Sequence, residues 1–276
     1  MSAAFPARIV CLSDETTETL YLLSEQDRIV GVSGFSTRPP EVRTKPRVST
    51  FNSANVDEIL ALAPDLVLTF SDVQADITKQ LVLRGLTVLN FNQRTLAGIF
   101  DMVRTLARLV GAQPAGDALV DSLQRQLDSI AASAESFPHH PRVYFEEWHD
   151  PLISGIGWVE ELVEIAGGIP VFPELRACGK AKDRVVDPAE VISRDPEVIF
   201  ASWCGMKTNL NEIQSRPGWD QVTAVRHGHL YEIPSSAILQ PGPAAITDGL
   251  RLLHERLARA ANPAPSPVPN ATRALL

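Results

Sequence analysis

The chain has 276 residues and a formal net charge of −8, with 45% hydrophobic and 21% charged residues. These proportions are typical of a soluble globular protein, whereas the acidic balance argues against binding to nucleic acid or to an anionic membrane surface. No apolar run reaches the roughly 18 residues that cross a bilayer, so we expect no membrane insertion.

The first half of the chain alternates short apolar strands with helices. Strands are predicted at 8–12, 28–32, 66–70 and 86–89, and helices at 14–25, 56–62 and 75–83. Continuous apolar strands between helices are typical of a parallel sheet that is covered on both faces. We therefore predict a first α/β lobe over residues 1–111.

A long amphipathic helix is predicted in the middle of the chain, after a helix at about 96–110. Its apolar residues Leu119, Leu123, Leu127 and Ile130 recur every three or four positions. We interpret residues 112–137 as a bridging helix, 138–262 as a second α/β lobe, and 263–276 as a disordered Pro/Ala-rich tail. In the second lobe, strands are expected at 142–146, 198–201 and 229–233, and helices at 158–166, 187–194 and 244–261.

One short phrase of sequence occurs twice. Residues 59–68 and 191–200 each carry the end of an apolar helix, a proline, an acid and an apolar strand, at an offset of 132 residues (191 − 59). Because this offset is close to half the chain, the repeat predicts two similar lobes. The expected fold class is α/β, with two Rossmann-like lobes joined by a single long backbone helix and a cleft between them.

The N-terminus and the cysteines bear on the cellular compartment. Residues 1–8 have no basic region and no long apolar core, and the three cysteines, Cys11, Cys178 and Cys204, form no CxxC pair. This pattern is unlike a secretory signal or a disulfide framework. The expectation is a cytoplasmic protein, or a periplasmic one if the given start is trimmed.

Ligands of open α/β sheets bind at the carboxyl ends of the strands, which selects a short set of candidate residues. Three of the four tryptophans fall there, and large aromatic side chains suit a flat, partly apolar ligand, although any one of them could instead fill the core. Phe70 of the first lobe could face Trp203 of the second across the cleft. The predicted ligand-binding residues are Asp14, Glu15, Phe35, Phe70, Asp72, Trp148, His149, Trp158, Trp203 and Gln240.

The same region allows other chemistry. His149 and Cys204 could act in an enzyme, but no catalytic-triad order accompanies them. The histidines lack the spacing of a metal site, and there is no P-loop or complete dinucleotide fingerprint, so we predict no metal site and no nucleotide. Two of the acids could form a catalytic pair, although acids in a first helical turn are also ordinary structural residues. These acids are Asp14, Glu15, Asp72, Glu146 and Glu147.

Several motifs follow one another along the chain in a specific order. They are Arg8–Leu12 followed by Thr17–Leu20, Asp27–Val32, Pro64–Val67, Pro196–Ile199 and Gly228–Tyr231. Together they resemble the substrate-binding proteins of the cobalamin and iron-siderophore ABC importers, and the vitamin B12-binding branch in particular. The resemblance covers residues 8–258, which is nearly the whole chain.

The resemblance implies two Rossmann-like lobes joined by one rigid helix, with the ligand in the cleft and no intrinsic cofactor. It also implies an aromatic residue after the third strand, where Phe70 stands, and a carboxylate on each lobe that contacts a transporter permease. Asp76 matches the first carboxylate by position, and Glu212 is the candidate for the second. Family members that feed an importer carry a signal peptide or a lipoprotein cysteine, and neither is seen in residues 1–8.

The leading hypothesis is a monomeric, non-enzymatic protein that binds a corrinoid such as cobalamin or cobinamide, or a related metal chelate. Its role would be ABC-type uptake or intracellular handling, and a single long bridging helix predicts little closure of the cleft. Three alternatives stay open. They are an enzyme or corrinoid-processing protein that uses the same cleft, an iron-siderophore or haem binder, and a protein that binds free metal.

Overall fold

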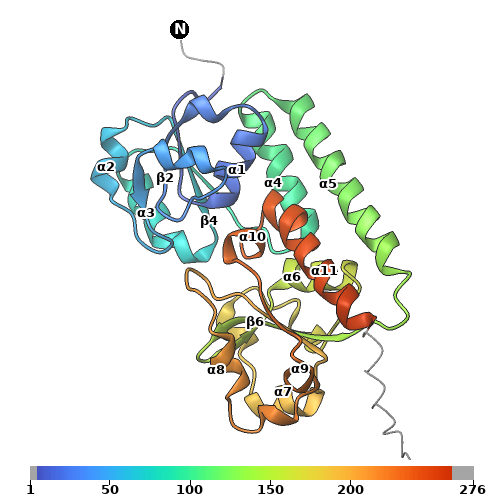
Figure 1. The fold of residues 1–276 in the computed structure, drawn as a ribbon. Coiled ribbons are helices and arrows are strands. Elements are labelled where there is room, and N and C mark those ends of the chain that lie inside the picture. The colour runs from blue at the N-terminus through green and yellow to red at the C-terminus, as the bar shows by residue number, and fades with distance from the viewer. Residues whose placement is uncertain (1–4, 263–276) are drawn as a thin grey trace, which may run out of the picture.

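The computed structural model describes residues 5–262, which form two α/β lobes, one above the other in Figure 1. Each lobe is built on its own sheet of five strands. Within residues 5–262, no helix is both long enough and apolar enough to cross a membrane. The tail predicted at 263–276 lies outside the described residues.

The sheet of the first lobe is entirely parallel, in the order β3-β2-β1-β4-β5. Its strands are β1 (Ile9–Cys11), β2 (Ile29–Ser33), β3 (Arg47–Ser49), β4 (Leu66–Phe70) and β5 (Val88–Phe91). Helices α1 (Asp14–Leu22) and α4 (Leu96–Leu109) pack on one face, and α2 (Val56–Ala61) and α3 (Ala75–Leu83) pack on the other. The central strands β1 and β4 are buried along their whole length, as a sheet covered on both faces requires.

The sheet of the second lobe is mixed and is built around the long strand β6 (Arg142–His149). Strands β8 (Ile169–Pro170) and β9 (Val198–Ala201) pair with β6 in parallel, β7 (Leu152–Ser154) pairs with it antiparallel, and β10 (Leu230–Glu232) extends the sheet beyond β9. Helix α6 (Gly157–Ile165) packs on one face. The short helices α7 (Pro188–Arg194), α8 (Leu210–Gln214) and α9 (Thr223–His227) pack on the other.

The repeated phrase has the same backbone conformation in both lobes. It joins α2 to β4 in the first lobe and α7 to β9 in the second. The residue before each proline has a left-handed φ, 45° at Ala63 and 42° at Asp195. The acid after each proline then accepts the backbone amide of an arginine at the start of the lobe's first strand. The two pairs are Asp65 with Arg8 at 3.0 Å and Glu197 with Arg142 at 2.9 Å.

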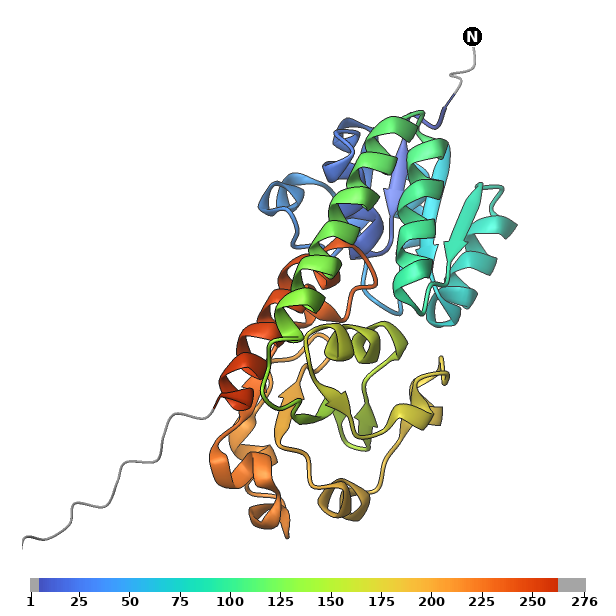
Figure 2. The same cartoon turned by 90° about the vertical axis from the view of Figure 1, so that its right-hand side faces the viewer.

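Two segments connect the lobes. Helix α5 (Gln113–Ala134) runs along both lobes (Figure 2), with Val120 in the core of the first and Leu123 in the core of the second. After β10, helix α10 (Ser235–Ile238) and the loop before the π-helical turn η7 (Ala245–Gly249) approach the first lobe, and α11 (Leu250–Ala261) then runs back along the core of the second lobe. Just before η7, the Ala244 amide donates to Glu18 of α1 at 3.0 Å. The predicted α/β fold, with two lobes joined by a long helix, is confirmed.

The structure departs from the sequence prediction mainly at short strands. The sequence analysis misses β3, β7 and β8, which have only two or three residues each and are defined by pairing with a neighbour. Strand β5 is displaced by two residues from the predicted 86–89, and α1 ends at Leu22 rather than near residue 25. The predicted helix at 244–261 begins with the π-helical turn η7.

Candidate functional site

Two adjoining cavities lie between the lobes, at the carboxyl ends of strands from both sheets. The first has a volume of about 510 Å³ and the second of about 630 Å³. Both are lined by Phe51, Phe70, Cys204 and Gln240, so they form two compartments of one cleft. This is the position at which parallel sheets place a ligand.

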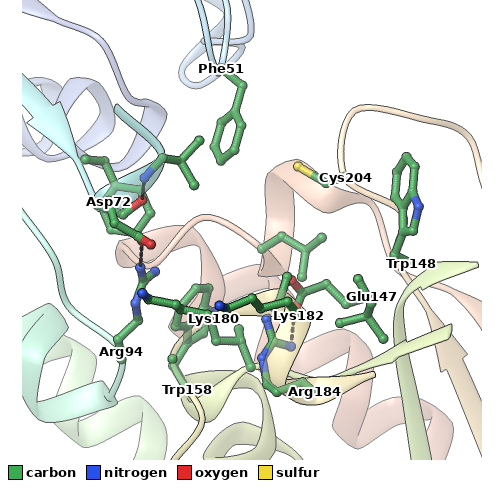
Figure 3. Close-up of a pocket in the computed structure, with 18 of the residues that line it drawn as sticks. Phe51, Asp72, Arg94, Glu147, Trp148, Trp158, Lys180, Lys182, Arg184 and Cys204 are labelled. Carbon is green, nitrogen blue, oxygen red and sulfur yellow. Dashed lines mark hydrogen bonds and ion pairs between the residues drawn. The ribbon is translucent and has the colours of Figure 1, made fainter. Parts of the chain in front are cut away.

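The first cavity has an aromatic and apolar wall, drawn in Figure 3. Phe51 and Phe70 come from the first lobe, and Trp148 and Trp158 come from the second. Trp158 lies in the first turn of α6, where its indole N–H donates to the Ile238 carbonyl at 2.9 Å. Ile153, Ile156 and Leu239 complete the apolar surface.

A buried amide holds the aromatic residues of the first lobe in place. The side chain of Gln74 accepts the Phe70 amide at 2.9 Å and donates to the carbonyls of Leu12 and Phe51 at 2.9 and 3.1 Å. It therefore ties together three loops that follow β1, β3 and β4. In the second lobe, a register shift between Glu146 and Trp148 in the β6–β7 pair turns both Glu147 and Trp148 toward the cavity.

Charged side chains line the remainder of the first cavity. The guanidinium of Arg184 is 1% exposed and binds both carboxylate oxygens of Glu147, at 2.6 and 3.0 Å. Arg94 donates to Asp72 at 3.1 Å and lies over the Phe70 ring, 5.3 Å from its centroid. Burial lowers the pKa of Arg94 from its ordinary value. Lys180 and Lys182 extend into the same space from the loop before Arg184 (Figure 3).

Half of the residues that line the second cavity carry hydroxyl or amide groups. These residues are Ser13, Ser33, Thr37, Thr50, Asn52, Ser235, Ser236 and Gln240. Asp14 also lines it and accepts a hydrogen bond from the Ser36 hydroxyl at 2.9 Å. Burial raises the pKa of Asp14 to about 6. Its apolar residues are Leu12, Phe35, Phe51, Phe70 and Met206, of which Phe35 and Met206 are about half exposed.

The structure brings together seven of the ten ligand-binding residues predicted from the sequence. Phe70 and Gln240 line both cavities. Asp72, Trp148 and Trp158 line the first, and Asp14 and Phe35 line the second. Glu15, His149 and Trp203 are on neither lining.

Those three residues have structural surroundings instead. Glu15 is a buried residue of α1 that packs against the loop at Gly242. The Trp203 ring is buried in the core of the second lobe, donates to Glu146 at 3.1 Å and stacks on His149 with centroids 4.2 Å apart. Trp203 therefore does not face Phe70 across the cleft, and Cys204, the residue after Trp203, lines both cavities.

The sequence analysis misses several residues that line the first cavity. Phe51 lies in the loop after β3, where its carbonyl accepts from Gln74, and no strand predicted from the sequence ends at this loop. Arg94 follows β5, at a position that the strand-end rule reaches. A signal did exist for Lys180, Lys182 and Arg184, because 176–184 holds four basic residues in an otherwise acidic chain.

Cys204 and Glu147 are poorly activated for catalysis, whereas Asp14, with a pKa of about 6, could exchange a proton near neutral pH. Burial raises the pKa of the Cys204 thiol to about 11, so the nucleophilic thiolate is scarce near neutral pH. Glu147 is held in its ion pair with Arg184. Within the described residues, no group of three or more His, Cys, Asp or Glu side chains could hold a metal ion.

Comparison with known proteins agrees with this architecture. A model of the family described as "Periplasmic binding protein" matches residues 9–237. An uncharacterized ABC transporter substrate-binding lipoprotein of Bacillus subtilis is 28% identical, over 91% of this chain and 80% of its own. A cobalamin-binding protein of Halobacterium salinarum is 25% identical, over 90% of this chain and 68% of its own. A periplasmic haem-binding protein of Pseudomonas aeruginosa has the same fold, with a TM-score of 0.77 and 20% identity over 94% of this chain and 95% of its own.

Proposed function

This chain belongs to the periplasmic binding protein family, and from that premise we propose that it binds a corrinoid, of the cobalamin or cobinamide kind, without catalysing a reaction. The aromatic wall of the first cavity carries the proposal. A flat macrocycle between the lobes would cover Phe51, Phe70 and Trp148, and such contacts are a main source of affinity for apolar rings. The similarity to a cobalamin-binding protein supports the same ligand class.

The donor atoms of the cleft favour a chelate whose metal already has its ligands. Among the described residues that line the two cavities there is no histidine and no tyrosine. The sulfur-bearing side chains there are Cys204 and Met206, and burial raises the pKa of the Cys204 thiol to about 11, so a metal would have to displace its proton. A corrinoid brings its own axial ligands to cobalt, whereas haem iron is generally held by a protein side chain. This difference favours the corrinoid over haem.

We place the binding step in ABC-type uptake, with a permease as the partner. Asp76 on α3 and Glu212 on α8 would contact it, one from each lobe, and both helices are on the left of Figure 1. Asp76 is exposed, and Glu212 is partly exposed and accepts a hydrogen bond from His149 at 2.9 Å. Asp76→Lys and Glu212→Lys should each lower ligand-stimulated ATPase activity in proteoliposomes that hold the permease and ATPase, and should leave corrinoid binding unchanged. Full stimulation by both variants would remove these residues from the docking surface.

Spectral titration with cyanocobalamin and dicyanocobinamide tests the ligand. We expect binding at micromolar protein or below, and Phe51→Ala should weaken it by about tenfold or more, because an aromatic contact on the ring is lost. Leu83→Ala is the matched control, since Leu83 is 75% exposed on α3 and lines neither cavity. The corrinoid should be recovered chemically unchanged. Failure of both corrinoids to bind would end this proposal, and binding of haemin alone would favour the haem alternative.

A further inference from the structure

The first cavity carries an excess of positive charge within an acidic protein. Four of its lining side chains are cationic and two are anionic, whereas the whole chain has a net charge of −8. The cations are Arg94, Lys180, Lys182 and Arg184, and the anions are Asp72 and Glu147. In Figure 3 the four cations lie together, below Phe51 in that view. A local excess of this sign suits an anionic group on the ligand.

The anionic side chains of the cavity are already used by the two arginines. Glu147 binds Arg184, and Asp72 binds Arg94. Within residues 5–262, Lys180 and Lys182 have no carboxylate within 4.0 Å. The buried Nε of Arg184 also has no hydrogen-bond partner in this part of the chain. Within the described residues, the cavity therefore has two unpaired ammonium groups and one unpaired guanidinium N–H that an anionic ligand group could bind.

A nearby acid does not neutralise these cations. Glu160 lies on α6 beside Gly155, and its carboxyl is buried. Burial raises the pKa of Glu160 to about 8, although Arg176 and Arg184 act in the opposite direction. The carboxyl is therefore mostly protonated near neutral pH, and the positive charge at the cavity stays uncompensated.

The lobe junction brings together the backbone segments that carry the cationic groups. Arg94 comes from the first lobe, and the loop at 176–184 comes from the second. Two residues after Arg94, the Leu96 amide donates to Glu161 of α6 at 2.8 Å. A Cβ on Gly157 would be 2.5 Å from the Arg94 carbonyl oxygen and 3.1 Å from the Arg176 carbonyl oxygen, so three backbone segments meet here. The backbone segments that carry the four cations are therefore in place before binding, and the two exposed lysine side chains would be ordered by the ligand.

We propose that this cationic compartment, formed by Arg94, Lys180, Lys182 and Arg184, holds an oxyanion on the rim of the bound chelate, either a phosphodiester or a carboxylate. The two lysines thereby discriminate between ligands that carry such a group and those that do not. This inference rests on the proposed function, because it assigns a subsite to the same cleft. It predicts a preference for cobalamin, which has a phosphodiester in its nucleotide loop, over cobinamide, which lacks one.

The test is the double variant Lys180→Gln/Lys182→Gln, titrated by absorbance with cyanocobalamin and dicyanocobinamide. It should bind cobalamin about tenfold more weakly than the wild type and cobinamide with unchanged affinity, because two charge-assisted contacts are lost only with the former. Both lysines are exposed, so we expect the fold to be kept. Lys79→Gln/Arg259→Gln makes the same charge change at exposed positions away from the cleft and should bind as the wild type does.

The outcomes separate this inference from the proposed function. Equal cobalamin affinity in wild type and double variant, with both binding tightly, overturns the inference and leaves the corrinoid proposal standing. If the wild type binds neither corrinoid, haemin and its dimethyl ester supply the second arm. A wild-type preference for haemin that the double variant loses upholds the subsite with a carboxylate and removes the corrinoid. Binding of none of the four ligands overturns both.

Discussion

Glu15 and Glu146 are both completely buried, one beside each sheet, but their surroundings differ. Glu146 on β6 accepts hydrogen bonds from Arg216 at 2.5 and 2.9 Å and from the Trp203 indole at 3.1 Å. Glu15 on α1 has no hydrogen-bond partner for either carboxylate oxygen within the described chain. Gly242 lies directly against it, at the junction of the two lobes.

Among residues 5–262, Glu146 is therefore a paired charge within the second lobe, whereas Glu15 is an unpaired carboxyl at the junction of the lobes. In the second lobe, Glu146 forms an ion pair with Arg216 and also accepts from the indole of Trp203, the residue before Cys204. At the junction, burial together with the charges of Asp14 and Glu18 raises the pKa of Glu15 to about 8. The carboxyl is accommodated there as the neutral acid. Three changes test this comparison, from the largest expected effect to the smallest.

Glu146→Ala should cause the largest loss of stability. It leaves the largely buried guanidinium of Arg216 without its counter-ion and the Trp203 indole N–H without an acceptor. Removal of one partner from a buried ion pair typically costs about 3–5 kcal/mol. Urea unfolding, followed by tryptophan fluorescence, measures it against Glu190→Ala, an exposed control on α7. A loss below about 1 kcal/mol would mean that the ion pair contributes little to the stability of the second lobe.

The pH dependence of stability should come from the junction. The folded-state pKa of Glu15 is above its unfolded value, so the folded protein holds this proton more tightly and stability falls as pH rises from about 4.5 to about 8. Asp14 and Glu160 act in the same direction. Glu15→Gln removes one of these titrating groups. The fall in the free energy of unfolding across this pH range should then be smaller, by an amount on the order of a few kcal/mol.

Urea unfolding at about pH 5.5 and about pH 8.5 makes this measurement, since the two values bracket most of the window. Glu15→Gln should gain stability relative to the wild type at the higher pH and little at the lower. Glu135→Gln, at an exposed position after α5, should keep the wild-type slope. An unchanged slope in Glu15→Gln would mean that Glu15 is ionised in the folded state.

The sequence predicts well what local pattern decides. Strand β4 and helix α3 have the predicted bounds, because each carries its own apolar pattern and a clear end, at Pro64 or Gly85. The repeated phrase predicts the two lobes, because in each lobe the acid after the proline accepts the backbone amide of an arginine at the start of the first strand. Strands β7 and β8 depend on pairing with β6, and a pairing with a distant strand leaves no signal in a segment of two or three residues.

The candidate site shows the same division. The strand-end rule selects Phe70, Asp72 and Trp148, which line the first cavity. It also selects Trp203, but it cannot say whether a side chain turns toward the cleft or into the core, and Trp203 turns into the core toward Glu146. The rule does not select the loop at 176–184, because no strand predicted from the sequence ends at that loop.

The smallest of the three effects should come from Gly242→Ala. An added Cβ would lie 2.5 Å from the Cβ of Glu15 and 3.1 Å from its Cα, and neither atom can move without α1. We expect a loss of about 1–3 kcal/mol, measured by urea unfolding, because overpacking of this kind must open the junction. Gly179→Ala should be nearly silent, since its nearest neighbour would be at 3.7 Å. Glu15→Ala keeps the obstructing Cβ and should not rescue Gly242→Ala, whereas Glu15→Gly should relieve the clash. A cost equally rescued by both would locate the crowding in the carboxyl group rather than in the packing of α1 against the junction.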